Sequence, residues 1–150
     1  MAKKAENKIV IFTDGGSRGN PGVSGVGVVI SNARGHLIKK SSKNIGTRTN
    51  NEAEYEAVIF GLQKTKQIFG KEKVKGLTIE VKMDSELVAR QLNGKYKIKE
   101  EKLVPLFIKV WNLKMDFGPV SFTEIPRAKN KEADALANEA MNVKEQASIF

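Results

Sequence analysis

The chain has 150 residues, enough for one domain with a sizeable hydrophobic core. Its 26 Lys and Arg residues outnumber its 17 Asp and Glu residues, and the resulting formal charge of +9 favours a polyanionic partner. The alternatives are an anionic membrane surface as the partner, and a soluble domain that is merely basic. The absence of cysteine excludes disulfide bonds and thiolate metal sites, and no apolar run approaches the ~20 residues of a membrane span or forms a signal peptide, so we expect a cytoplasmic protein without a membrane partner.

The N-terminal third predicts three antiparallel strands. Residues 1–7 are expected to form a flexible basic segment ahead of a buried strand over Ile9–Thr13. Two further strands follow over Gly22–Ser31 and His36–Asn44, with a turn at Asn32–Gly35 between them. Connections this short between successive strands predict an antiparallel meander.

The remaining segments alternate helices with strands. Apolar periodicity predicts four helices, over Asn51–Phe69, Ser85–Leu92, Glu100–Met115 and Asn130–Met141. It also predicts two strands, over Leu77–Met83 and Val120–Ile125. Because right-handed crossovers add strands in parallel, we expect an α/β fold. Its five-stranded mixed sheet joins the antiparallel meander to two parallel strands, with helices on both faces. One domain should span 1–150, with a tail over 142–150.

Two aspartates stand at the ends of predicted strands. Asp14 follows the first strand and Asp84 follows the fourth. If these strands are parallel neighbours, their carboxyl ends lie side by side, where open α/β sheets place their sites. Each residue has an ordinary alternative role, because Asp14 precedes a glycine, as turn residues do, and Asp84 precedes a helix as its N-cap.

Two helical carboxylates are predicted to face the same edge. Glu54 shares the core-facing stripe of its helix with Leu62, and Asp134 shares that of the last helix with Ala137. The alternatives are that Glu54 closes a capping box begun by Asn51, and that Asp134 is an acidic residue favoured in a first helical turn.

These four carboxylates together predict a metal site. Unpaired carboxylates that share a small space repel one another and shift each other's pKa values. Divalent cations relieve that repulsion, and ligation by oxygen alone selects a hard ion such as Mg²⁺ or Mn²⁺.

Four motifs occur in the order "TDGGSRGNPG", "TNNEAEYEA", "KMDSELV" and "NKEADALANEA", between Thr13 and Ala140. With them the chain resembles a type 1 ribonuclease H, of the archaeal or bacterial single-domain kind without a basic handle. The resemblance implies the RNase H-like fold and an endonuclease. It would use two Mg²⁺ ions, or Mn²⁺, to hydrolyse the RNA strand of an RNA–DNA hybrid, leaving 5′-phosphate and 3′-hydroxyl ends.

The resemblance carries the metal-ligand roles over to Asp14, Glu54, Asp84 and Asp134, and it implies a monomer without an obligate protein partner. Two alternatives stay open. The chain could be a non-catalytic domain that binds hybrids or other nucleic acids, or another nuclease of the same superfamily.

The resemblance also implies substrate contacts in the glycine-rich segment and around the paired asparagines. The candidates are Gly15, Ser17, Asn20, Thr49, Asn50 and Asn51, with Thr49 at a phosphate on the DNA side. Asn20 could instead belong to a plain turn and the paired asparagines to a helix cap. Lys95 and Lys97 would contact backbone phosphates or form a solvated lysine face. Arg18 is open between nucleic acid and solvent.

Family members often carry a catalytic-loop histidine, whereas this chain has only His36, in a hairpin. Arg127, seven residues before Asp134, resembles an arginine of archaeal-like members, and we hypothesise that it assists water positioning or product release. Glu124 aligns with the histidine position if no gap is allowed. The alternative is that Arg127 is simply a basic loop residue. At the C-terminus, Ile149 and Phe150 are expected to dock on the domain.

Overall fold

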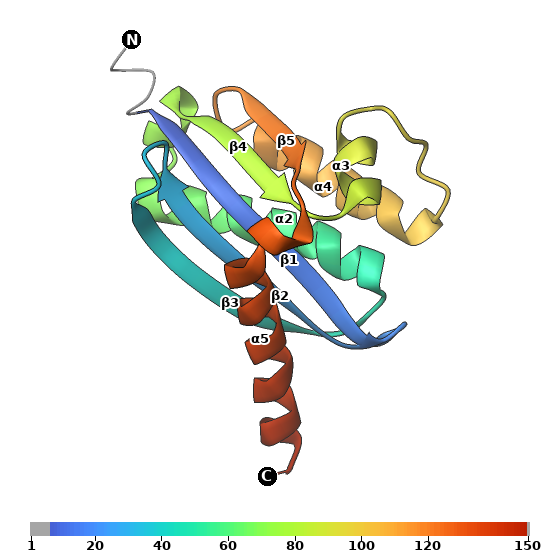
Figure 1. The fold of residues 1–150 in the computed structure, drawn as a ribbon. Coiled ribbons are helices and arrows are strands. Elements are labelled where there is room, and N and C mark those ends of the chain that lie inside the picture. Colours follow the sequence, from blue (N-terminus) through green and yellow to red (C-terminus); the bar gives the residue numbers. More distant parts are fainter. Residues whose placement is uncertain (1–6, 150) are drawn as a thin grey trace.

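The structure, a computed structural model, describes residues 7–149, with side chains described as far as residue 142 (Figure 1). Its sheet has the strand order β3-β2-β1-β4-β5. The strands are β1 (Lys8–Gly19), β2 (Gly22–Asn32), β3 (Leu37–Arg48), β4 (Thr78–Met83) and β5 (Val120–Glu124). The pairs β1–β2 and β2–β3 are antiparallel, whereas β4 and β5 join in parallel, so the predicted mixed sheet is confirmed.

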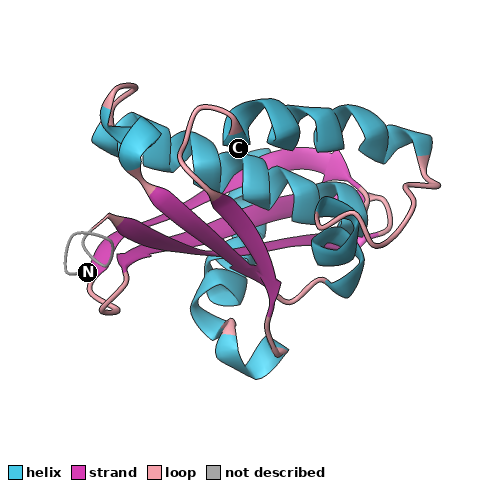
Figure 2. Cartoon of the chain, turned by 90° about the horizontal axis from the view of Figure 1, so that it is seen from above, coloured by secondary structure: helices cyan, strands magenta, loops and turns pink. Residues whose placement is uncertain are grey.

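Helices cover both faces of this sheet, as predicted (Figure 2). One face carries α2 (Asn50–Phe69), α3 (Glu86–Leu92) and α4 (Val104–Lys114), and α5 (Lys131–Ile149) crosses β1 and β2 on the other face (Figure 1). Three short 3₁₀ turns complete the chain, namely η1 (Lys73–Gly76), η2 (Glu101–Leu103) and η3 (Arg127–Lys129). None of the described helices has the length and apolar character needed to cross a bilayer.

The first strand is longer than predicted, because β1 runs through the glycines and stays paired with β2 as far as Gly19. Asp14 therefore lies inside a strand and not at its end. The pairing of β1 with β4, however, stops at Thr13 and Met83. Asp14 and Asp84 consequently both follow the last paired residues of these parallel neighbours, which is the juxtaposition that the sequence predicted.

Other boundaries also moved. The last helix was predicted to end at Met141 but continues to Ile149, so 142–149 is helical. The expected docking of Ile149 and Phe150, and the flexibility expected of residues 1–6, lie outside the described part of the chain. The helix predicted to start at Glu100 begins instead as η2, and α4 follows with a proline in its first turn.

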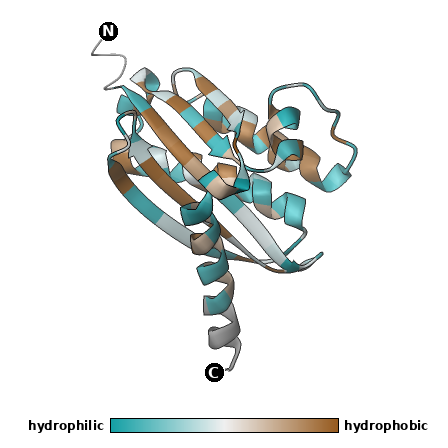
Figure 3. Cartoon of the chain, viewed as in Figure 1, coloured by the Kyte–Doolittle hydropathy of each residue, from teal (hydrophilic) through white to brown (hydrophobic). Residues whose placement is uncertain are grey.

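The two faces of β2 are packed differently. Val28 and Ile30 point into the main core toward α2, and Figure 3 shows hydrophobic segments along β1, β2 and β4. On the other face, a Cβ on Gly27 would lie 2.3 Å from the carbonyl oxygen of Ala133. The backbone of α5 thus lies directly on glycines of β2, which fixes the start of α5 close to the end of the β1–β4 pairing.

The two edge strands are protected in different ways. Strand β3 is long and largely exposed, and it carries Lys39, Lys40 and Lys43 along its surface. Strand β5 is short, with Pro119 immediately before it and Pro126 two residues after its end.

Candidate active site

The four predicted carboxylates line one hollow of about 210 Å³ beside the end of the β1–β4 pairing. Asp14 comes from β1, Glu54 from α2, and Asp84 from the residue after β4. Each of these three offers a carboxylate oxygen within 4.8 Å of the others. Asp134, from the first turn of α5, lines the same hollow and its charge acts on Asp14. The structure therefore brings the whole predicted set together.

Glu54 is held by the backbone of β1. The amide of Gly15 donates a 2.8 Å hydrogen bond to Oε1 of Glu54. A Cβ on Gly15 would lie 2.0 Å from the carbonyl oxygen of Ala53, so only glycine allows strand and helix to approach this closely. Asp14 and Glu54 are 7% and 8% exposed, so both carboxylates are largely removed from water.

The capping roles that were alternatives for two carboxylates belong to other residues. Ser85, not Asp84, caps α3 by accepting a hydrogen bond from the amide of Val88. Thr49 caps α2 in a capping box with Glu52, so Glu54 has no part in the cap. Helix capping therefore does not account for Asp84 or Glu54.

The prediction for Asp134 was wrong in one respect. The buried stripe of α5 consists of Ala133, Ala137, Ala140 and Met141. Asp134 is exposed and lies at the border of that stripe, in the first turn of the helix as the alternative interpretation allowed. It still reaches the hollow, because α5 lies so close to the sheet that a border position faces the carboxylates.

Burial and neighbouring negative charge disfavour the ionisation of Asp14 and Glu54. Burial, together with the charges of Glu54, Asp84 and Asp134, raises the pKa of Asp14 to about 9. Burial also raises the pKa of Glu54 to about 8, although the Gly15 amide and the Arg127 guanidinium act in the opposite direction. A concave, oxygen-only cluster that resists its own negative charge has the donor chemistry of a hard divalent cation site. The residues present therefore fit the metal that the sequence predicted.

The two candidates for the catalytic loop are separated by the structure. Arg127, in η3, lines the hollow, and its charge opposes the rise in the pKa of Glu54. Glu124 ends β5 beside Met83, and its side chain lies 4.0 Å from Arg90, outside the lining of the hollow. Arg127 is thus at the site and Glu124 is not.

The glycine-rich segment is joined to the start of α2 by polar contacts. Ser17 donates a 2.8 Å hydrogen bond to the carbonyl oxygen of Arg48, and it also contacts the carbonyl oxygen of Gly19. Asn20 accepts a 3.0 Å hydrogen bond from the backbone amide of Asn50, the first residue of α2. Ser17 and Asn50 line the hollow, so this network forms one wall of the site.

Arg18 belongs to the same wall. It lines the hollow and donates a 3.4 Å hydrogen bond to the carbonyl oxygen of Asn138 on α5. Two roles were considered for Arg18, contact with nucleic acid and exposure to solvent. The structure adds a third, because Arg18 also links β1 to α5.

The remaining candidates lie on a neighbouring surface. Asn51 donates a 2.9 Å hydrogen bond to Oε1 of Glu100. Lys95, Lys97 and Lys99 line a separate hollow of about 550 Å³. A buried chain of hydrogen bonds supports this loop, from the Tyr55 hydroxyl to Gln91 (2.6 Å) and from Gln91 to the Lys97 carbonyl (3.2 Å).

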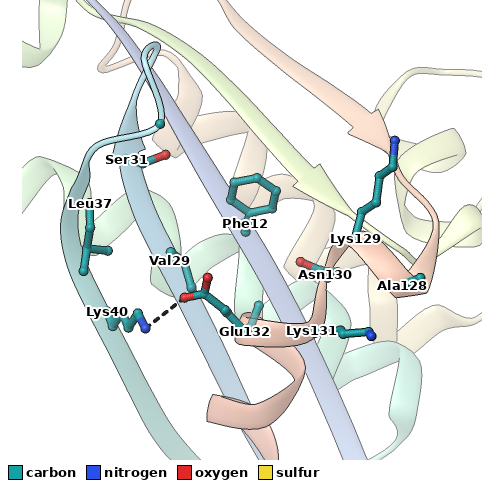
Figure 4. A pocket seen from close by; sticks show the side chains of 12 residues that line it. Phe12, Val29, Ser31, Leu37, Lys40, Ala128, Lys129, Asn130, Lys131 and Glu132 are labelled. Atoms are coloured by element: carbon teal, nitrogen blue, oxygen red, sulfur yellow. Dashed lines mark ion pairs between the residues drawn. The ribbon is translucent and has the colours of Figure 1, made fainter.

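A larger hollow, of about 620 Å³, lies on the α5 face of the sheet (Figure 4). Phe12 and Val29 form its floor, and Lys40 pairs with Glu132 across it at 2.8 Å (Figure 4). None of the four carboxylates lines this hollow, so the smaller, acidic one is the candidate active site.

Asn130 lies between these two hollows and was missed in the sequence. It is 2% exposed and donates to the Thr13 carbonyl (2.8 Å) and to Oδ2 of Asp84 (3.0 Å). Its position directly before a helix is typical of an N-cap, and only the strand order reveals that β1 and β4 lie within its reach.

Comparisons with known proteins agree on one family. A family model described as "Reverse transcriptase-like" matches residues 12–140. The bifunctional protein Rv2228c of Mycobacterium tuberculosis is 39% identical over 142 residues, which cover 94% of this chain and 37% of the relative. Ribonuclease HI of Halobacterium salinarum is 38% identical over 135 residues, or 90% of this chain and 65% of the relative. The chain thus spans little more than a third of the mycobacterial relative that it matches.

Among solved structures, LC11-RNase H1 in complex with an RNA/DNA hybrid superposes with a TM-score of 0.86 at 47% identity. That superposition covers 91% of this chain and 98% of the other.

Proposed function

Because the chain belongs to the type 1 ribonuclease H family, we propose that it is an endoribonuclease that hydrolyses the RNA strand of RNA–DNA hybrids. The convergence of Asp14, Glu54, Asp84 and Asp134 on one hollow is the observation that carries the proposal. The similarity to a ribonuclease H1 crystallised with a hybrid supports the choice of substrate. The formal charge of +9 suits a polyanion.

The four carboxylates would hold two divalent metal ions, Mg²⁺ by preference and Mn²⁺ as the alternative. When bound, such ions supply a reactive water at neutral pH and stabilise the charge that develops on the phosphate and the leaving oxygen. The products would carry 5′-phosphate and 3′-hydroxyl ends. Burial of Asp14 and Glu54 prepares these side chains for cations, because ionisation of both is unfavourable until positive charge arrives.

The wall beside the carboxylates would select RNA. Gly15, Ser17, Asn20, Asn50 and Asn51 are the proposed contacts to the RNA strand, where a 2′-hydroxyl distinguishes RNA from DNA. The hydrogen bond from Asn50 to Asn20 supports this role, since it fixes the wall before substrate binds. A preformed wall loses less conformational entropy on binding.

The DNA strand would lie over the start of α2 and the lysine loop. The Thr49 hydroxyl already accepts from the Glu52 amide, which leaves its proton available for a phosphate oxygen. Lys95 and Lys97 would add contacts to backbone phosphates and a dependence of affinity on salt.

Arg127 would act beside the metal ligands, either by positioning water or by assisting product release. Its place in the lining of the hollow supports this role, and the position of Glu124 does not support an equivalent one. We further propose that residues 1–150 form one catalytic domain that works as a monomer in the cytoplasm. The lack of cysteine fits a reducing compartment, and the high positive charge favours a monomer.

The test is cleavage of labelled RNA–DNA hybrid, duplex RNA and single strands in Mg²⁺ or Mn²⁺, with Asp14→Asn as the control. We expect cuts in the RNA strand of the hybrid and none with Asp14→Asn. Equal activity of the two proteins would refute the metal mechanism, and cleavage of DNA would refute the substrate.

A further inference from the structure

Asn130 occupies the junction of the elements that carry three of the four carboxylates. Its Nδ2 donates to the carbonyl oxygen of Thr13, the residue before Asp14, and to Oδ2 of Asp84. Its backbone carbonyl accepts from the amide of Asp134 at 3.1 Å. One residue therefore makes direct hydrogen bonds to β1, to the end of β4 and to the first turn of α5.

The orientation of the Asn130 amide follows from its partners. Both groups that it approaches through Nδ2 are acceptors, a backbone carbonyl and a carboxylate, so the nitrogen must face them. The opposite atom, Oδ1, is buried and has no hydrogen-bond partner among the described residues. Leaving a buried acceptor unpaired is unfavourable, so this orientation has a cost that the two bonds of Nδ2 must offset.

An asparagine directly before a helix ordinarily caps it, because its Oδ1 accepts from an amide of the first turn. Asn130 precedes α5 but makes no such bond, since its Oδ1 is unpaired and its Nδ2 faces the sheet. The side chain therefore forgoes a local stabilising role in favour of contacts to the strand ends. Departures from local preference of this kind are expected at functional sites.

The contact to Asp84 has a specific electrostatic effect. Asp84 faces Asp14 and Glu54 across less than 4.8 Å, and repulsion between these carboxylates would rotate an unrestrained side chain away from the hollow. Asn130 carries no charge, so it restrains one oxygen of Asp84 without neutralising the cluster. The other Asp84 oxygen stays available to a cation.

We propose that Asn130 is a positioning residue for the metal centre, which holds Asp84 and the start of α5 in the arrangement that binds divalent cations. This inference rests on the proposed function, because it takes Asp84 and Asp134 to be metal ligands. Partners that orient metal ligands change metal affinity by roughly 10- to 100-fold when they are removed.

The test measures binding of Mn²⁺ alone to the full chain by titration calorimetry, without substrate. Asn130→Ala removes the amide, and Asn130→Ser removes it while keeping a residue type that is favoured before helices, which protects folding. Asn93→Ala is the matched control, because its amide donates a comparable 2.9 Å hydrogen bond to the Phe122 carbonyl without touching a carboxylate. Unfolding in EDTA measures the stability of each variant.

We expect Asn130→Ala and Asn130→Ser to weaken Mn²⁺ binding by about tenfold or more, and to raise the Mn²⁺ concentration for half-maximal cleavage by a similar factor. Asn93→Ala should lose stability and keep its Mn²⁺ affinity. Mn²⁺ affinities within twofold of the wild type for both Asn130 variants would overturn the inference. A wild-type protein that binds no Mn²⁺ would instead overturn the proposed function, and the inference with it.

Discussion

The amide of Gly15 and the carboxylate of Glu54 are joined by a 2.8 Å hydrogen bond between a strand and a helix that touch backbone to backbone. The position of Glu54 is therefore set by the main chain of β1 and does not depend on side-chain packing alone. Such a contact is sensitive to a single methyl group, which makes it open to direct test.

Gly15→Ala should separate β1 from α2 at the site. The added Cβ would lie 2.0 Å from the Ala53 carbonyl oxygen, so the helix must shift and the bond to Glu54 must lengthen. We expect a loss of about 3 kcal/mol of unfolding free energy, measured in urea, and a fall of roughly 100-fold in kcat/KM, since small misplacements of catalytic groups have effects of that size.

Gly76→Ala is the matched control for that experiment. Nothing lies within 4 Å of a Cβ at Gly76, and its backbone needs no left-handed conformation. This variant should keep its stability within about 1 kcal/mol and its full activity. If Gly15→Ala behaves like Gly76→Ala, the close contact has no role in catalysis.

The metal-free protein should lose stability as pH rises. The pKa of Asp14 goes from 3.8 to about 9 on folding, and that of Glu54 from 4.5 to about 8. The folded state thus keeps protons that the unfolded state has released. The contribution is fully present below about pH 4 and is lost progressively until the folded pKa values are passed near pH 8–9.

Asp14→Asn should reduce that pH dependence. In EDTA at pH 7 we expect the variant to be more stable than the wild type by roughly 1–3 kcal/mol, while cleavage is lost. Thermal unfolding across pH 4–9 measures the effect. A wild-type protein whose metal-free stability is flat over this range would contradict the prediction.

Tyr55→Phe should loosen the lysine loop. The Tyr55 hydroxyl donates to Gln91, which in turn holds the Lys97 carbonyl, and all of this lies beneath the loop surface. Removing the hydroxyl leaves the Gln91 oxygen buried without its donor, at an expected cost of about 1–3 kcal/mol.

The same variant should raise KM for hybrid more than it changes kcat, because the metal ligands are untouched. Steady-state kinetics at two salt concentrations would show this. An unchanged KM would mean that the loop takes no part in substrate binding.

Arg127→Ala should lose turnover, and Glu124→Ala should not. Arg127 lines the acidic hollow, whereas Glu124 faces Arg90 outside it. We expect a loss of at least tenfold in kcat for Arg127→Ala, in line with the effects of groups that assist proton or charge movement. Single-turnover rates separate water positioning, which slows cleavage itself, from product release, which slows only later turnovers. Full activity of Arg127→Ala would leave it a plain basic loop residue.

The order of elements and the candidate carboxylates were predictable because their signals are local, although the core-facing position predicted for Asp134 was wrong. Alternating apolar residues identified the strands, and helical spacing placed Glu54 inward, where the structure has it. The course of β1 beyond Asp14 was not predictable, because glycines ordinarily end a strand, and only close approach of α2 and α5 explains them here.

The cap of α2 and the role of Asn130 were missed for a related reason. Thr49, Asn50 and Asn51 all have residue types that cap helices, and the structure gives that role to Thr49, whose hydroxyl accepts from the amide of Glu52. The amide of Asn50 instead donates to Asn20, 30 residues away in the chain. Asn130 likewise meets Thr13 across 117 residues. Contacts of this range depend on the completed sheet, which no local pattern encodes.

The protection of the sheet edges has a consequence for a protein that gathers on a polyanion. Molecules crowded along one nucleic acid meet at high local concentration, where bare strand edges would join into intermolecular sheets. Lys39 and Lys43 make two copies of β3 repel each other, and Pro119 and Pro126 confine pairing at β5 to a few residues. Lysines of β3 thereby oppose aggregation through this edge, apart from the surface on which Lys95 and Lys97 are proposed to contact phosphates.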